Sequence, residues 1–163
     1  MAIFGCAFDC GDGRSQGASR KWQKAKCGVE FVDKITVAGL VKRLAEKDDL
    51  TIAFVRRELY IYLTKHKSKV VTISAHDDCA GNRTAKKKQL KQLRRARRII
   101  VGMIKSFKLD WEVNVFLLWV NGNWMPEEID PGKINIPHFV PQFAAKNRET
   151  FSPKEPAYVH GAD

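Results

Sequence analysis

The sequence predicts a single α/β domain with a mostly parallel β-sheet flanked by helices, and three observations support that fold class. Short β-branched apolar runs alternate with segments of helical period along residues 3–120, which is the pattern of a parallel sheet with crossover helices. The length of 163 residues suits one domain with a substantial core. The hydrophobic fraction of 44% is ordinary for a globular protein.

The N-terminal part of the chain is predicted to contain two strands joined by a loop. Residues 3–8 form a short apolar run, which predicts a buried strand that ends just before Cys10. Residues 11–28 are rich in Gly, Ser, Lys and Arg, and we expect a loop that could hold a helical turn around Trp22. Residues 29–37 contain two β-branched runs and predict the second strand.

The middle of the chain is predicted to contain two helices and a strand. Residues 40–44 predict a short helix, and residues 51–65 predict the clearest amphipathic helix. Its apolar face comprises Ile52, Val55, Leu59, Tyr62 and Leu63. Suitable N-terminal capping residues precede or begin it, namely Asp48, Asp49 and Thr51. Residues 70–74 then predict a buried strand that leads to His76.

The last part of the chain is predicted to contain a long basic helix, a strand and a tail. Residues 84 to about 107 predict the helix, with a buried stripe of Leu93, Ala96, Ile100, Met103 and Phe107. Residues 112–120 predict a strand that turns at residues 121–123. All six prolines lie between Pro126 and Pro156, which predicts extended, non-regular structure. We therefore divide the chain into an α/β domain of residues 1–130 and a proline-containing extended C-terminal tail of residues 131–163.

Two absences suggest where the protein works. No apolar run reaches the ~18 residues that a membrane span needs. The first residues lack the basic region and the long apolar stretch of a signal peptide. We therefore expect a cytoplasmic protein, in which the four cysteines are thiols or metal ligands rather than disulfides. We expect Cys6 to pack in the core and Cys27 to be a free thiol.

The positive charge of the chain is concentrated in one segment. The formal net charge is +11, and residues 79–109 carry eleven Lys and Arg but no Asp or Glu. The rest of the chain is therefore balanced, and an electrostatic partner is to be sought at this segment. A solvated face that aids solubility or attracts small anions is the simpler interpretation, and a phosphate contact with nucleic acid through residues 83–98 is the alternative. Aromatic residues are absent from residues 79–106, so we do not expect single-strand recognition there.

Two short motifs are the most informative feature of the sequence. Cys10, Asp12 and Arg14 form a C-x-D-x-R motif, and His76 and Cys79 form an H-x-x-C motif. Each motif follows a predicted strand and leads into Gly-containing sequence, which is where reactive groups lie in open α/β sheets. Two thiolates and one imidazole suit Zn²⁺, and a catalytic zinc keeps three protein ligands with one position open. We therefore expect zinc at Cys10, His76 and Cys79, or, if the motifs arise by chance, ordinary thiols and a salt bridge between Asp12 and Arg14.

The two motifs together resemble those of the β-class carbonic anhydrases. The resemblance implies a β-carbonic-anhydrase-like fold with zinc on Cys10, His76 and Cys79, and a catalytic dyad of Asp12 and Arg14 that orients a zinc-bound hydroxide. It also implies reversible hydration of CO₂ to bicarbonate, with a homodimer or a higher homo-oligomer as the assembly. In some members of that family the matching Asp moves onto the zinc.

Two other functions are compatible with the same residues. The first is a non-enzymatic, zinc-stabilised module that binds nucleic acid or an acidic partner through the basic helix. The second is a related hydrolase acting on carbonyl sulfide or carbon disulfide, since substrate choice depends on apolar pocket walls that the sequence does not identify.

Overall fold

The structure, a computed structural model, describes residues 2–131. In this part of the chain a five-stranded sheet has the order β2-β1-β3-β4-β5. The strands are β1 (Phe4–Asp9), β2 (Phe31–Thr36), β3 (Val70–His76), β4 (Asn114–Val120) and β5 (Pro126–Ile129). The first four strands are parallel, and β5 is antiparallel to β4. The predicted α/β class with a mostly parallel sheet is thus confirmed.

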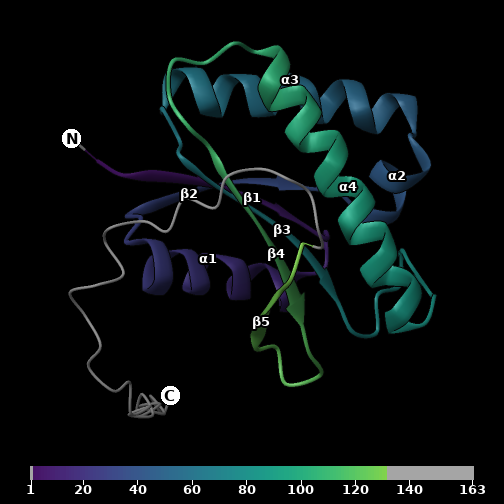
Figure 1. Ribbon diagram of the computed structural model, residues 1–163. Coiled ribbons are helices and arrows are strands. Elements are labelled where there is room, and N and C mark those ends of the chain that lie inside the picture. The colour runs from purple at the N-terminus through teal and green to yellow at the C-terminus, as the bar shows by residue number, and fades with distance from the viewer. Residues whose placement is uncertain (1, 132–163) are drawn as a thin grey trace, which may run out of the picture.

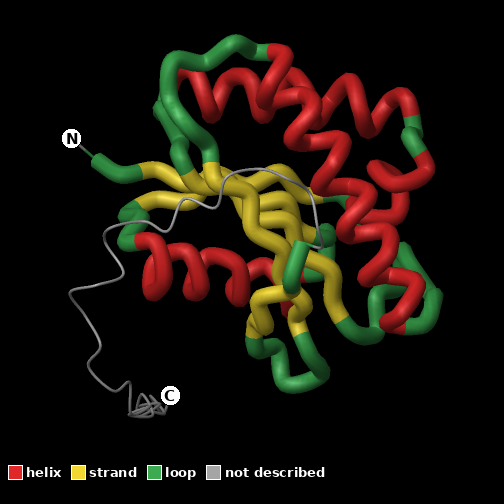
Figure 2. Tube along the Cα trace, viewed as in Figure 1, coloured by secondary structure: helices red, strands yellow, loops and turns green. Residues whose placement is uncertain are grey.

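The helices cover the two faces of the sheet unequally. They are α1 (Gly13–Cys27), α2 (Leu40–Glu46), α3 (Asp49–Lys65) and α4 (Lys86–Ser106). Of the helices within residues 2–131, α1 lies on one face of the sheet, and α2, α3 and α4 form a layer on the other (Figures 1 and 2). The main apolar core lies between the sheet and this second layer, where Cys6, Phe8 and Ile73 meet Leu59 and Leu93. The prediction that Cys6 packs in the core is confirmed.

Helices α3 and α4 bury apolar side chains at the helical spacing that predicted them. In α3 the side chains of Val55, Leu59 and Leu63 are fully buried, and the Asp48 side chain accepts a hydrogen bond from the Thr51 N–H at 3.1 Å. In α4 the predicted stripe is buried from Leu93 to Met103, whereas Phe107 at the helix end is half-buried. No helix in the described residues is long and apolar enough to cross a membrane.

The prediction of a loop over residues 11–28 is wrong, because this segment forms the helix α1. Its buried side chains are Ser15, Ala18, Ser19, Trp22 and Gln23, which have helical spacing but are mostly small or polar. The helix therefore has a buried face, but this segment of the sequence lacks the apolar periodicity that would have predicted it. The side chain of Asp12 caps the helix at its start, and Gly28 ends it with φ of 66°, in the left-handed region that glycine adopts without strain.

The prediction of non-regular structure from Pro126 onward is also wrong at its start. Pro126 is the first residue of β5, which pairs with β4 from Val120↔Pro126 to Leu117↔Ile129 after the predicted turn. A proline lacks the N–H of a ladder bond but is tolerated at the first position of an edge strand. The predicted tail of residues 131–163 lies, apart from Pro131, outside the described residues.

Candidate metal centre

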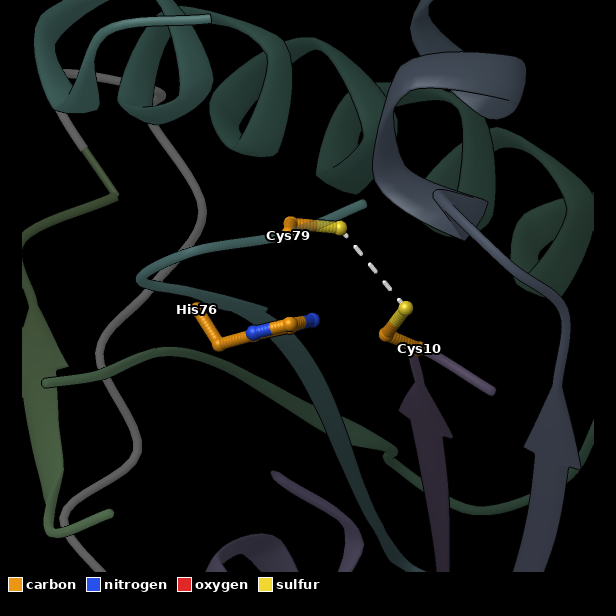
Figure 3. Close-up of side chains that lie close together, drawn as sticks. All are labelled: Cys10, His76 and Cys79. Atoms are coloured by element: carbon orange, nitrogen blue, oxygen red, sulfur yellow. Dashed lines mark hydrogen bonds between the residues drawn. The ribbon is translucent and has the colours of Figure 1, made fainter. Parts of the chain in front are cut away.

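The residues of the two motifs meet at one end of the sheet. Cys10 directly follows β1, His76 is the last residue of β3, and Cys79 lies in the loop after β3. Strands β1 and β3 are adjacent and parallel, so their carboxyl ends reach the same edge. The structure therefore brings Cys10 close to His76 and Cys79, more than sixty positions further along the chain, as predicted (Figure 3).

The three candidate ligands form a compact, buried group. The Sγ atoms of Cys10 and Cys79 are 3.7 Å apart, and one potential ligand atom from each of the three residues lies within 4.8 Å of the others. Their exposed fractions are 6% for each cysteine and 1% for His76. Such a group of soft and borderline donors could hold a metal ion.

His76 is oriented toward the two sulfur atoms. Its Nδ1 is 2.6 Å from the carbonyl oxygen of Asp77, an arrangement that fixes the ring and leaves Nε2 to face the sulfurs (Figure 3). The Nε2 atom is buried and has no hydrogen-bond partner among the described residues. A buried polar atom without a partner costs free energy, and a metal ion in the gap would satisfy it.

The electrostatic surroundings of the cysteines favour a thiolate at Cys10. A hydrogen bond from the Cys79 thiol lowers the pKa of Cys10 to about 3, and the backbone N–H of Gly39, 3.4 Å from Cys10 Sγ, acts in the same direction. The same bond raises the pKa of Cys79, because its proton is held by the neighbouring thiolate. Without a metal the pair therefore keeps one proton, which a divalent cation would displace.

Asp12 and Arg14 form a bidentate pair beside the cysteine–histidine group. The Arg14 Nη2 donates to Asp12 Oδ2 at 2.7 Å, and Nε donates to Oδ1 at 3.1 Å. This pairing lowers the pKa of Asp12 to about 2. The guanidinium of Arg14 also lies 4.5 Å from the ring centre of Trp124, a contact that the motif alone did not predict. Asp12 is additionally the N-cap of α1, so the start of that helix places the carboxylate.

A buried aspartate next to Cys10 was missed by the sequence analysis. Asp9 is fully buried, and its carboxylate accepts hydrogen bonds from Ser19 Oγ and Ser74 Oγ, each at 2.7 Å. The ammonium group of Lys34 also contacts it. These partners come from α1, β3 and β2, so one carboxylate joins three elements around the site. The available signal was an acidic residue placed inside the buried run between Phe8 and Cys10.

A tight backbone contact brings the second motif against the chain that follows β2. Gly39 has φ of 64°, and a Cβ atom at this position would lie 2.4 Å from the carbonyl oxygen of Gly81. The loop after Cys79 therefore packs directly on residues 38 and 39, and this contact holds the Gly39 N–H at Cys10 Sγ. Neither glycine figured in the predicted site.

An open cleft of about 420 Å³ gives access to this end of the sheet. Its lining includes Cys79 and Arg14, together with Asp78, Arg83 and Lys86. Asp78 Oδ2 is 3.6 Å from Arg14 Nη1 at the rim, where its side chain is 85% exposed. Neither Asp77 nor Asp78 belongs to the compact ligand group described above. The cysteine–histidine group is thus buried but lies next to solvent-accessible space.

The fold and the site define an α/β protein with a buried Cys–His–Cys centre at the carboxyl edge of a parallel sheet. A family model described as "Putative carbonic anhydrase" matches residues 1–130. The chain belongs to this family, which confirms the resemblance given by its two motifs.

Two solved structures are similar to the chain at low sequence identity. The carbonic anhydrase from Glaciozyma antarctica is 14% identical with a TM-score of 0.44, over 76% of this chain and 80% of that one. The β-carbonic anhydrase CafA of Aspergillus fumigatus is 15% identical with a TM-score of 0.41, over 82% of this chain and 78% of that one. No curated protein sequence matches the chain significantly.

Proposed function

We propose that this protein catalyses the reversible hydration of CO₂ to bicarbonate with a zinc ion held by Cys10, His76 and Cys79. The observation that carries the proposal is the buried Nε2 of His76, which has no hydrogen-bond partner within residues 2–131 and faces two sulfur atoms 3.7 Å apart. Two sulfurs bound to one tetrahedral zinc at ~2.3 Å would be ~3.8 Å apart, so the observed spacing suits this ion. Membership of the carbonic anhydrase family supports the same reaction.

The ligand set leaves room for the chemistry that the reaction needs. A bound zinc ion with three protein ligands supplies Lewis acidity, which lowers the pKa of water from 15.7 to about 7. Cys10 and Cys79 neutralise the ion, which weakens this effect, so a neighbouring hydrogen-bond acceptor becomes valuable. Asp12 is that acceptor in our proposal, since Arg14 holds its carboxylate ionised.

The Asp12–Arg14 pair would orient the attacking oxygen. The carboxylate of Asp12 accepts one hydrogen bond from the water-derived nucleophile, and this fixes the direction of the lone pair that attacks CO₂. Arg14 holds Asp12 through two hydrogen bonds and rests on the ring of Trp124. The guanidinium therefore acts by positioning Asp12, while the open cleft allows CO₂ to enter and bicarbonate to leave.

Stopped-flow CO₂ hydration on protein of measured zinc content tests the proposal. Asp12→Asn keeps the helix-capping oxygen but removes the charge, and we expect hydration to fall about 100-fold with zinc content unchanged. Asp48→Asn is the matched control, because Asp48 caps α3 in the same way away from the site. Its activity should equal that of the wild type.

Metal analysis of a ligand variant completes the test. Cys79→Ala should lose zinc, because two ligands do not hold the ion against solvent. Folded wild-type protein that takes up no zinc would contradict the metal assignment. Zinc-loaded protein that turns over carbonyl sulfide but not CO₂ would keep the site and contradict the substrate.

A further inference from the structure

The exposed side of α4 carries a stripe of positive charge that the hydration reaction does not use. Lys88, Lys91, Arg95 and Arg98 are exposed and follow one another at spacings of three and four residues. At 100° per residue they lie within ~80° of arc, and at 1.5 Å per residue they span ~15 Å of helix. We call these four residues the α4 stripe.

The α4 stripe has no counter-charge in its own helix or in the ion pairs of the described residues. Helix α4 contains no Asp or Glu, and none of the four side chains takes part in an ion pair within residues 2–131. Like charges at this spacing destabilise a helix. A face that served solubility alone would interleave both signs and avoid this cost.

The composition and position of the α4 stripe favour duplex nucleic acid over a lipid surface or a single strand as its polyanionic partner. The apolar side of α4 is buried in the core through Leu93, Ala96 and Ile100, so the helix cannot insert it into a lipid interface. The exposed stripe contains no aromatic side chain on which an unpaired base could stack. A duplex offers one phosphate charge per ~1.7 Å of axis, or about nine along the ~15 Å of the stripe. The rigid and dense charge of a duplex matches a row of four cations carried on one helix.

We propose that the α4 stripe binds the phosphate backbone of duplex nucleic acid, independently of base sequence. The proposal does not rest on the hydration of CO₂, because the stripe and the cysteine–histidine group share no residue. The helix would lie along the backbone, with each of the four cations near one phosphate. No base-specific contact is involved, since the stripe has only Lys and Arg to offer.

Fluorescence anisotropy with a labelled 24-base-pair duplex DNA, and with duplex RNA of the same length, tests this surface. Four neutralised phosphates predict a slope of about −3.6 for log K against log[salt], and an affinity loss of about 150-fold between 50 and 200 mM salt. The quadruple variant K88Q/K91Q/R95Q/R98Q should lose binding at 50 mM salt. Zinc content and CO₂ hydration should not change, which separates this result from the proposed function.

A matched control on the opposite face separates the stripe from net charge. Helix α1 exposes Arg20, Lys21, Lys24 and Lys26 on the other side of the sheet (Figure 1). R20Q/K21Q/K24Q/K26Q removes the same total charge, and we expect it to keep most of the affinity. Equal loss in both variants would overturn the assignment to α4. Equal binding to poly-glutamate, to phosphatidylserine vesicles or to single-stranded DNA would overturn the assignment to duplexes.

Discussion

Replacing Asp9 by Ala should destabilise the protein by about 3 kcal/mol, a value that follows from the contacts of the buried carboxylate. Breaking a buried ion pair costs about 3–5 kcal/mol when it leaves one charge unpaired. Here the cost is reduced, because the Lys34 side chain is 24% exposed and keeps Ser19 Oγ at 3.0 Å. The Ser74 hydroxyl, only 2% exposed, loses its acceptor and adds about 1 kcal/mol or more.

Urea unfolding of the wild type, Asp9→Ala, Lys34→Met and the double variant measures this contribution. A loss of about 3 kcal/mol corresponds to a fall in Tm of about 10 °C for a domain of this size. We expect Asp9→Ala and Lys34→Met to be strongly non-additive, since both break the same contact. A loss below about 1 kcal/mol for Asp9→Ala, or additive effects of the two substitutions, would refute the reasoning.

Two further predictions concern other parts of the site and the helix that carries Asp12. Gly39→Ala should cost about 3 kcal/mol in urea unfolding, because the left-handed φ is strained and the new Cβ would meet the Gly81 carbonyl at 2.4 Å. At Gly28, which has a similar φ, the new Cβ would meet no atom of the described part of the chain within 4 Å apart from its sequence neighbours, so Gly28→Ala should cost about 1 kcal/mol; equal costs would contradict the backbone contact. Burial, with the charge of Glu128, raises the pKa of Cys27 to about 11. Iodoacetamide should therefore label Cys27 about 100-fold more slowly at pH 8 than a thiol of pKa 9, with the rate rising toward pH 11; rapid labelling at pH 8 would contradict this.

The strands and the apolar helices could be predicted because their signals are local. The β-branched run that became β3 and the apolar period of α3 both reflect burial against a single large core. The meeting of Cys10, His76 and Cys79 could be predicted because the motifs follow strands, and parallel strands end at one edge. Their convergence still required β1 and β3 to be neighbours, and neither motif predicts the strand order.

The features that were missed depend on contacts between distant residues. Helix α1 buries Ser15, Ser19 and Gln23, which a hydropathy pattern reads as solvent-facing. Asp9 resembles a surface residue until Ser74 and Lys34 are known to surround it. Strand β5 is four residues long and begins with a proline, so its only clear cause is the free edge of β4. Local propensity carries none of this information.

The packing on the two faces of the sheet therefore differs, being mainly apolar on one and richer in hydrogen bonds on the other. The candidate metal centre depends on the hydrogen-bonded face. On the side of α2, α3 and α4 the packing is apolar and supplies most of the hydrophobic stabilisation. On the side of α1 the helix is joined to the sheet by hydrogen bonds, including those from Gln23 Nε2 to the Cys6 carbonyl oxygen at 2.9 Å and to Thr72 Oγ1 at 2.8 Å.

Hydrogen bonds are directional, so they fix the position of α1 more closely than apolar contacts of the same number would. Because Asp12 caps this helix and Arg14 lies in its first turn, the polar layer determines where the Asp12–Arg14 pair lies relative to Cys10. A buried carboxylate, a buried glutamine and several hydroxyls occupy positions on this face where apolar side chains would contribute more hydrophobic stabilisation. Their hydrogen bonds instead position Asp12 beside the cysteine–histidine group.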